Sequence, residues 1–311
     1  MSSVSEVDRA SLDAAATTGP AAPTGVGPAV PAGVANDDLP VTVIEARKGW
    51  QLIDFRELWR YRELLWCLTW RDVAVRYKQA VLGVAWAVLQ PLSTMIVFTL
   101  VLGRTVGSQT TDVPYPLHVF AGMMTWTFFS SAVNSAANSV VGNQNLITKV
   151  YFPRLVVPLS AVGVSFVDLA ISFVMLFLLM LWFGVLPTAT FAMVPVSLGL
   201  LAAAAMGIGT LLSALTVAYR DFRYALSFGM QLWMFATPCI YVDPLTALGE
   251  RSRWLLPLNP AYGLILNFQN AVLGRAPDYY ALVVSGILAM LSIVIGAAYF
   301  RRVERSFADI I

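Results

Sequence analysis

Few residues in this chain could carry out chemistry, and their spacing excludes the common catalytic and nucleotide-binding sites. The 311 residues include only three lysines, Lys48, Lys78 and Lys149. None of them completes a G-x-x-x-x-G-K-[ST] pattern, so the chain has no P-loop that could cradle ATP, and no G-x-S-x-G nucleophile elbow occurs. His118 is the only histidine, and Cys67 and Cys239 lie far apart, so no metal-ligand spacing is present and nothing predicts a disulfide.

The acidic residues beyond position 78 are scattered along the chain. They are Asp112, Asp168, Asp221, Asp243, Glu250, Asp278, Glu304 and Asp309. An enzyme embedded in a membrane needs clustered acids or a metal at one face, and these acids are mostly single residues beside apolar segments. We therefore expect no catalytic residue and no metal, and we expect the protein to move something rather than to break bonds.

Asp168 is the exception, because it lies near the middle of a long apolar stretch. An unpaired carboxylate at that depth in a membrane costs at least about 2.5 kcal/mol, so it should face protein or a cavity. It could contact a substrate, relay protons, or form a hydrogen bond to a neighbouring helix, including as the neutral acid. No second acid or histidine in the apolar stretches completes a relay, which favours the structural hydrogen bond.

The composition indicates a polytopic membrane protein. The chain is 58% hydrophobic and 12% charged, whereas ordinary soluble domains are about 25% charged. Six apolar stretches approach the length of about 20 residues that a crossing helix needs, near 81–103, 117–141, 156–183, 191–217, 224–242 and 281–300. We expect an all-α protein with a six-helix transmembrane domain over 41–311. Residues 1–40, rich in Ala, Pro, Gly and Thr, are expected to form a disordered cytoplasmic tail and not a signal peptide.

The basic residues orient these spans. With six crossings both termini share one side, and 16 of the 20 Lys and Arg residues fall on that side. Positive residues concentrate in cytoplasmic loops, so we expect both termini in the cytoplasm and the protein in the cytoplasmic membrane.

Residues 50–78 precede the first span and predict an amphipathic helix. Its large apolar residues follow helical spacing with one gap: Phe55, Trp59, Trp66, Trp70, Val73 and Tyr77. Arginines and Lys78 fall between them, and tryptophan prefers the level of the lipid headgroups, which favours a helix lying in the cytoplasmic interface. A soluble helix packed on a partner is the alternative.

Residues 255–274, before the last span, are apolar but interrupted. The breaks are at Pro257, Asn259, Pro260 and Gly263. A crossing here would place the C-terminal arginines outside, so we expect a re-entrant pair of short helices, which membranes tolerate only where the backbone is buried in protein or lines a cavity. The alternative is a surface loop lying on lipid.

The second expected span carries candidate channel-lining residues. Asn134 and Asn138 share a helix face, and such side chains either bind helices together or line pores. Trp126, Phe128 and Phe129 could stack on sugars, or could belong to the ordinary aromatic belt at the membrane surface. Together with Asp168 these residues are our candidate lining.

The segment KVYFPRLVVPLS, residues 149–160, lies on the expected cytoplasmic side between two spans. Its prolines, of which Pro153 is the first, would make it stiff. Tyr151 and Phe152 are aromatic anchors of the kind that dominates interfaces, and Lys149 and Arg154 add charge. The segment could be the surface on which a partner pushes, or a turn with cations that reach the lipid headgroups.

Several segments, in order, resemble one family. They are RDVAVRYKQAVLGVAWAVLQPL, NLITKVYFPRLVVPLSAV, YRDFRY, the LNP before the last span, and the terminal YFRRVERSFADII. Together they resemble the permease subunit of type-2 ABC transporters that export polysaccharides such as O-antigen, capsule, teichoic acid or galactan. The resemblance covers about 50–311, and the tail at 1–40 departs from it.

The resemblance implies two copies of this chain, two separate cytoplasmic ATPase subunits that bind ATP and Mg²⁺, and a lipid-linked glycan as substrate. It implies an ATPase-coupling helix at Asn145, Lys149, Tyr151, Phe152, Pro153 and Arg154. It implies an inner gate helix with Arg71, Arg76, Tyr77 and Lys78, and an outer closure that includes Pro257, Asn259, Pro260 and Tyr262.

Other functions stay open on the residues alone. A type-2 ABC exporter of a drug or small lipid would have a similar pattern, although the basic helix and the FPR loop favour a glycan. A membrane-embedded glycan-modifying enzyme would need more acids. A proton-driven flippase is suggested only by Asp168.

Overall fold

Every regular element that the structure describes is a helix. The computed structural model describes residues 55–78, 83, 85–103, 114–219, 221–240 and 254–304. The expected tail at 1–40 lies outside these ranges. The described helices belong to one unit, residues 50–311.

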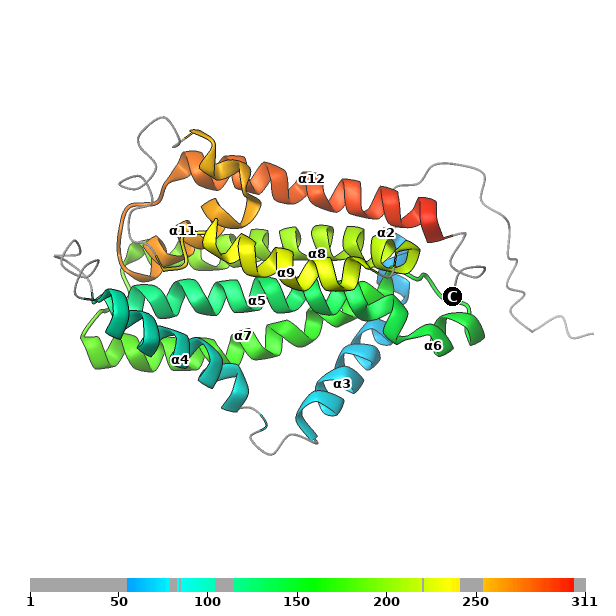
Figure 1. The fold of residues 1–311 in the computed structure, drawn as a ribbon, viewed down its shortest axis with the longest axis horizontal. Helices are drawn as coiled ribbons and strands as arrows, with labels where there is room; N and C mark the ends of the chain where they lie inside the picture. Colours follow the sequence, from blue (N-terminus) through cyan, green and yellow to red (C-terminus); the bar gives the residue numbers. More distant parts are fainter. Residues whose placement is uncertain are drawn as a thin grey trace, which may run out of the picture. The chain divides into compact units, whose positions relative to one another are not determined.

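Four long helices form the body of this unit. They are α5 (Tyr115–Gly142), α7 (Val156–Phe183), α8 (Val194–Ala218) and α12 (Tyr279–Glu304). Figure 1 shows them running side by side, with α5 packed on both α7 and α8, and α12 packed on the other side of α8. The largest fully buried side chains fill the space between them and include Phe120, Phe128, Phe129, Leu201, Phe268 and Phe300.

Four of the expected spans are present as helices long and apolar enough to cross a membrane. They are α4 (Ala85–Leu102), α7, the stretch Ala189–Ala218 that joins the short 3₁₀ helix η2 (Ala189–Met193) to α8, and α12. The second expected span is α5, whose 28 residues exceed the length needed, but its serine and asparagine residues lower its mean hydropathy below that of the other four.

The fifth expected span, 224–242, is not one helix of crossing length in the described residues. The helix here, α9 (Phe222–Phe235), has 14 residues, about 21 Å, whereas the hydrocarbon core is about 30 Å thick. Turns follow at 236–240, where Pro238 cannot continue a helix. The side-chain amide of Asn259 donates to the carbonyl oxygen of Ala236 and so occupies the end of α9.

The expected amphipathic segment forms two helices, α2 (Phe55–Arg60) and α3 (Arg62–Lys78), separated at Tyr61. Helix α3 packs on α7 (Figure 1). The tryptophans of both helices are exposed: Trp59 of α2, and Trp66 and Trp70 of α3.

The interrupted segment before the last span contains the 3₁₀ turn η4 (Leu256–Leu258) and helix α11 (Pro260–Val272). Helix α11 packs on α12, α8 and α5, and Leu264, Ile265 and Phe268 have no exposed surface. The alternative of a loop lying on lipid is therefore wrong for α11, because its side chains are enclosed by protein.

Helices α8 and α12 approach closely because glycines face each other. A Cβ atom at Gly296 would lie 2.2 Å from the carbonyl oxygen of Gly207, and one at Gly207 would lie 2.4 Å from the backbone nitrogen of Ile293. Small residues allow such approach, and van der Waals packing then holds membrane helices together.

We predict that Gly296→Leu destabilises the protein by about 1–3 kcal/mol, because the added side chain forces α8 and α12 apart. Thermal unfolding of the purified chain in detergent measures this. Gly199→Leu is the matched control, since a Cβ there meets nothing within 4 Å. Equal melting temperatures for the two variants would contradict the packing described.

Candidate functional site

The end of the molecule that contains α6 (Gln144–Lys149) brings together most of the residues singled out in the sequence. Helix α6 follows α5 at Asn143, and the segment 150–155 then leads into α7. Asn145, Lys149 and Tyr151 are exposed, Tyr151 to 82%, whereas Phe152 is only 6% exposed. The two neighbouring aromatic residues thus have different surroundings: one is available to a partner and the other is not.

Phe152 belongs to a hydrophobic cluster that joins several helices at this end. The other buried members are Leu68, Val140, Ile147, Leu155, Val156, Val157, Ala214, Val217 and Phe300. Arg154 also faces the protein, and its guanidinium donates a hydrogen bond to the carbonyl oxygen of Glu304 in the last turn of α12. A cation at a helix C-terminus is favourable, so Arg154 and Phe152 hold the loop to the body of the chain.

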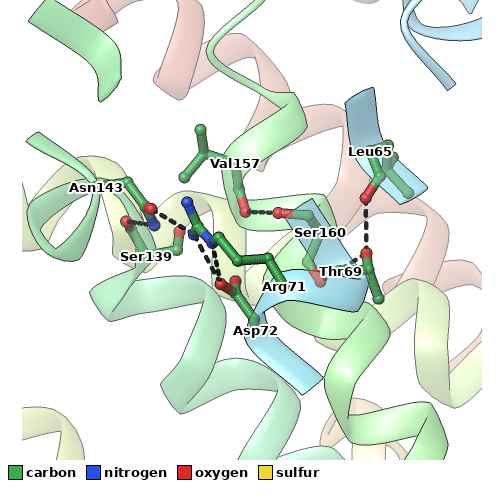
Figure 2. Close-up of polar contacts among 8 residues, drawn as sticks. All are labelled: Leu65, Thr69, Arg71, Asp72, Ser139, Asn143, Val157 and Ser160. Atoms are coloured by element: carbon green, nitrogen blue, oxygen red, sulfur yellow. Dashed lines mark hydrogen bonds and ion pairs between the residues drawn. The ribbon is translucent and has the colours of Figure 1, made fainter. Parts of the chain in front are cut away.

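Helix α3 is attached to α7 by a buried contact. The Thr69 hydroxyl donates to the carbonyl oxygens of Leu65, at 2.8 Å, and Ser160, at 3.2 Å (Figure 2). Gly163 faces this threonine, and a Cβ there would lie 2.7 Å from the Thr69 methyl carbon. The two helix backbones therefore lie as close as they can at this point.

Asp168 accepts hydrogen bonds from the last turn of α3. Arg76 Nη1 lies 2.6 Å from Asp168 Oδ2, and the Tyr77 hydroxyl donates to Oδ1. Burial, together with the adjacent carboxylate, raises the pKa of the Tyr77 phenol well above its ordinary value, so this hydroxyl stays protonated as a donor. The contact observed here is a hydrogen bond and ion pair to a neighbouring helix, which is one of the three roles considered for Asp168.

The partner of Asp168 was not found from the sequence. We expected a hydrogen bond to a neighbouring helix but did not identify that helix, and the partners lie on the amphipathic helix, 91 and 92 residues earlier. Arg76 was one of several basic residues on that helix, and its spacing alone did not separate it from those that face water.

Arg71 reaches from α3 to the junction of α5 and α6. Figure 2 shows its guanidinium between Asp72 and Asn143, with Nη2 lying 2.7 Å from both Asp72 Oδ1 and Asn143 Oδ1. Asn143 ends α5 and precedes α6, and its amide donates to the Ser139 carbonyl oxygen at 2.9 Å. Asn143 was not a predicted site residue, although the change from a long apolar run to QNLITK marks a helix boundary there. Lys78 is exposed.

The aromatic candidates for the channel lining lie in the core. Trp126, Phe128 and Phe129 are almost completely buried. The rings of Trp126 and Phe129 contact Trp233 of α9, at centroid distances of 6.4 and 5.3 Å. In this structure they are packed against other helices and have almost no exposed surface.

The polar candidates for the channel lining, unlike the aromatic ones, are partly exposed. Between Leu117 and Val140 every half-exposed residue of α5 is polar: Thr127, Ser130, Ser131, Asn134, Ser135 and Asn138. We call these six residues the α5 polar stripe. Asn134 and Asn138 each donate to a carbonyl oxygen one turn earlier in α5, and Arg223 Nε donates to Asn138 Oδ1 at 3.0 Å.

At the opposite end, Asn259 joins α9 to α11. Its Oδ1 accepts from the Ala261 backbone nitrogen at 3.1 Å and from Trp233 Nε1 at 2.7 Å, so that it caps α11 and holds α9. Pro260 is the first residue of α11, where a proline costs no hydrogen bond. Pro257 and Tyr262 are buried beside it.

Comparison with known proteins gives a consistent result. A family model described as "ABC-2 type transporter" matches residues 63–273. The chain is 29% identical over 257 residues to the O-antigen export system permease protein RfbA of Myxococcus xanthus, an alignment covering 82% of this chain and 97% of that protein. It is 24% identical over 250 residues to the protein of the same name from Klebsiella pneumoniae, covering 80% and 95%. It is 23% identical over 245 residues to the polysialic acid transport protein KpsM of Escherichia coli, covering 76% and 92%.

We predict that Arg76→Met lowers the free energy of unfolding by about 1–3 kcal/mol, because it leaves the Asp168 carboxylate without its ion-pair partner. Lys78→Met removes an exposed cation from the same turn and should change stability little. Asp168→Asn should cost less than Arg76→Met, since the amide oxygen can still accept from Tyr77. Thermal unfolding in detergent compares the three, and equal values for Arg76→Met and Lys78→Met would rule out this role of the ion pair.

Proposed function

The chain belongs to the ABC-2 type transporter family, and we propose that it is the permease subunit of an ATP-driven exporter that carries a polyprenyl-linked polysaccharide across the cytoplasmic membrane. The observation that carries the proposal is the extent of the alignments to the two O-antigen permeases and the polysialic acid transport protein. They cover 92–97% of those proteins, so the likeness extends over nearly the whole of each relative.

The energy for transport would come from a partner. The sequence has no P-loop, so we propose that two separate ATPase subunits bind ATP and Mg²⁺ and act on a dimer of this chain. The permease would then supply the path and the moving parts, while ATP hydrolysis takes place on the partner.

For the topology we propose six crossings with both termini in the cytoplasm. The four apolar helices supply four of them, and α5 lies along α7 and α8 and supplies another. For the remaining crossing we propose the segment that begins with α9 and includes the turns at 236–240. Helix α11, enclosed by α5, α8 and α12, would be the re-entrant element that closes the outer face with Pro257, Asn259, Pro260 and Tyr262.

For ATPase coupling we propose a division of the predicted residues by exposure. Asn145, Lys149 and Tyr151 would contact the ATPase, since their side chains are exposed. Phe152, Pro153 and Arg154 would pass the force onward, since Phe152 and Arg154 are bound to the cluster and to α12. A rigid displacement needs both a contact surface and a stiff attachment.

For the path of the glycan we propose the α5 polar stripe, with Asn134 and Asn138 as the predicted members. Its hydroxyl and amide groups are partly exposed on an otherwise buried helix, and they can exchange hydrogen bonds with sugar hydroxyls. Helix α3, with Arg71, Arg76, Tyr77 and Lys78, would border the inner entrance. Asp168 would act there through α3 rather than on the glycan.

The function is tested in the source organism by deleting the gene. Lipid-linked glycan should then accumulate at the cytoplasmic face and disappear from the cell surface, and the wild-type gene should restore export. Normal surface glycan in the deletion strain would contradict the proposal.

The division of the coupling segment gives a sharper prediction. Tyr151→Ala should weaken binding of the ATPase subunit about tenfold while leaving thermal stability unchanged, because an exposed aromatic anchor is lost. Phe152→Ala should lower the free energy of unfolding by about 3–5 kcal/mol, because it empties a buried site. Affinity measurements with purified subunits and thermal unfolding separate the two effects.

Trp182→Ala is the control for Tyr151→Ala, since Trp182 is equally exposed but lies at the far end of α7. If Tyr151→Ala and Trp182→Ala bind the ATPase subunit with equal affinity, Tyr151 is not an anchor.

A further inference from the structure

Helix α3 makes two kinds of contact with the rest of the chain, and they differ in how easily they can open. Toward α7 it is bound by the Thr69–Ser160 hydrogen bond and by the Arg76–Asp168 ion pair. Toward the junction of α5 and α6 it is bound by the hydrogen bond between Arg71 and Asn143.

The contacts with α7 are expected to be permanent. Thr69 is buried against Gly163, and the Asp168 side chain is only 17% exposed. Opening either contact would leave a polar or charged group in an apolar environment without a partner, which is costly.

The contact between Arg71 and Asn143 can open more easily. The Arg71 side chain is 44% exposed, and water competes for exposed polar contacts, which therefore add little net stability. Arg71 also has a second partner, because its Nε and Nη2 both donate to Asp72 Oδ1, at 2.9 and 2.7 Å. Arg71 can thus release Asn143 and keep its charge paired with Asp72. The guanidinium therefore has a hydrogen-bond partner whether or not it contacts Asn143.

Asn143 is placed to respond to α6. It is the residue between α5 and α6, its backbone nitrogen donates to carbonyl oxygens in the last turn of α5, and its carbonyl oxygen accepts from Leu146 and Ile147 in α6. A tilt of α6 against α5 must change the backbone angles at this junction, and the Asn143 side chain moves with them.

We propose that Asn143 and Arg71 are positioning residues that connect α6 to α3, so that displacement of α6 by an ATPase subunit opens the Arg71–Asn143 contact and changes the surroundings of the amphipathic helix at the inner entrance while α3 stays attached to α7. The inference rests on the proposed function, because it assumes that a partner displaces α6. It adds a defined side-chain contact through which that displacement reaches α3.

The chain contains its own reporter. Cys67 is exposed on α3, one turn after Glu63 and one turn before Arg71, on the charged face of the helix. Cys239 is buried, so a maleimide should modify Cys67 selectively. The rate of modification reports the surroundings of α3 and not the stability of the fold.

The experiment uses the complex of the full chain with its ATPase subunit in vesicles of phosphatidylethanolamine and phosphatidylglycerol. Maleimide modification of Cys67 is followed by mass spectrometry without nucleotide and after trapping with ATP and vanadate, and ATP hydrolysis is measured in parallel. In the wild type the two rates should differ by about fivefold, the size of a modest coupling between sites.

Asn143→Ala and Arg71→Met should abolish this difference while ATP hydrolysis continues. Arg71→Lys, which can still donate to Asn143, should retain most of it, and Gln144→Ala, an exposed neighbour in α6, should retain all of it. Melting temperatures show whether each variant is folded. If Asn143→Ala does not fold, Arg71→Met alone tests the contact.

Two results would overturn the inference alone: an unchanged response in both Asn143→Ala and Arg71→Met, or no response in a wild-type complex that hydrolyses ATP. If the wild-type chain binds no ATPase subunit, the proposed function fails and the inference fails with it.

Discussion

The carboxylate of Asp168, placed inside an apolar helix, is the constraint on which the arrangement at the inner end depends. A charge in α7 requires a partner, and Arg76 and Tyr77 supply it from α3. That requirement holds α3 against α7, and the Thr69–Ser160 contact then fixes its register. With α3 in this place, Arg71 comes within hydrogen-bond distance of Asn143, and the amphipathic helix is connected to the segment proposed to receive the ATPase.

The helices could be predicted from the sequence wherever a continuous apolar stretch had the length of a membrane crossing. The third span was predicted near 156–183 from the length of its apolar stretch, and these are the bounds of α7, which ends at Gly184 in a left-handed conformation. Helix α9 ends before the predicted bound of its span: Pro238, which the sequence shows, cannot continue a helix, and Asn259, distant in sequence, binds the end of α9. Such tertiary contacts leave no trace in local periodicity.

The site was predicted less completely, for a related reason. Exposure of Tyr151 and burial of Phe152 could not be distinguished, since neighbouring aromatic residues are alike in composition. The rings of Trp126, Phe128 and Phe129 were candidates for a channel lining because aromatic rings can stack on sugars, and their burial could not be predicted because a helix that is apolar on most faces does not reveal which face is enclosed. The polar residues of α5 were the better signal: at 3.6 residues per turn they gather on one side, and that side is the half-exposed one.

The most direct test of the central claim, that the Asp168–Arg76 pair attaches α3 for transport, is a double-mutant cycle on ATP-dependent export of the lipid-linked glycan into inverted vesicles. Arg76→Gln leaves the carboxylate unpaired, whereas Arg76→Gln combined with Asp168→Asn leaves no charge to compensate. We predict that Arg76→Gln loses most export and that the double variant regains much of it. A double variant no more active than Arg76→Gln, at equal amounts of folded protein, would contradict the account.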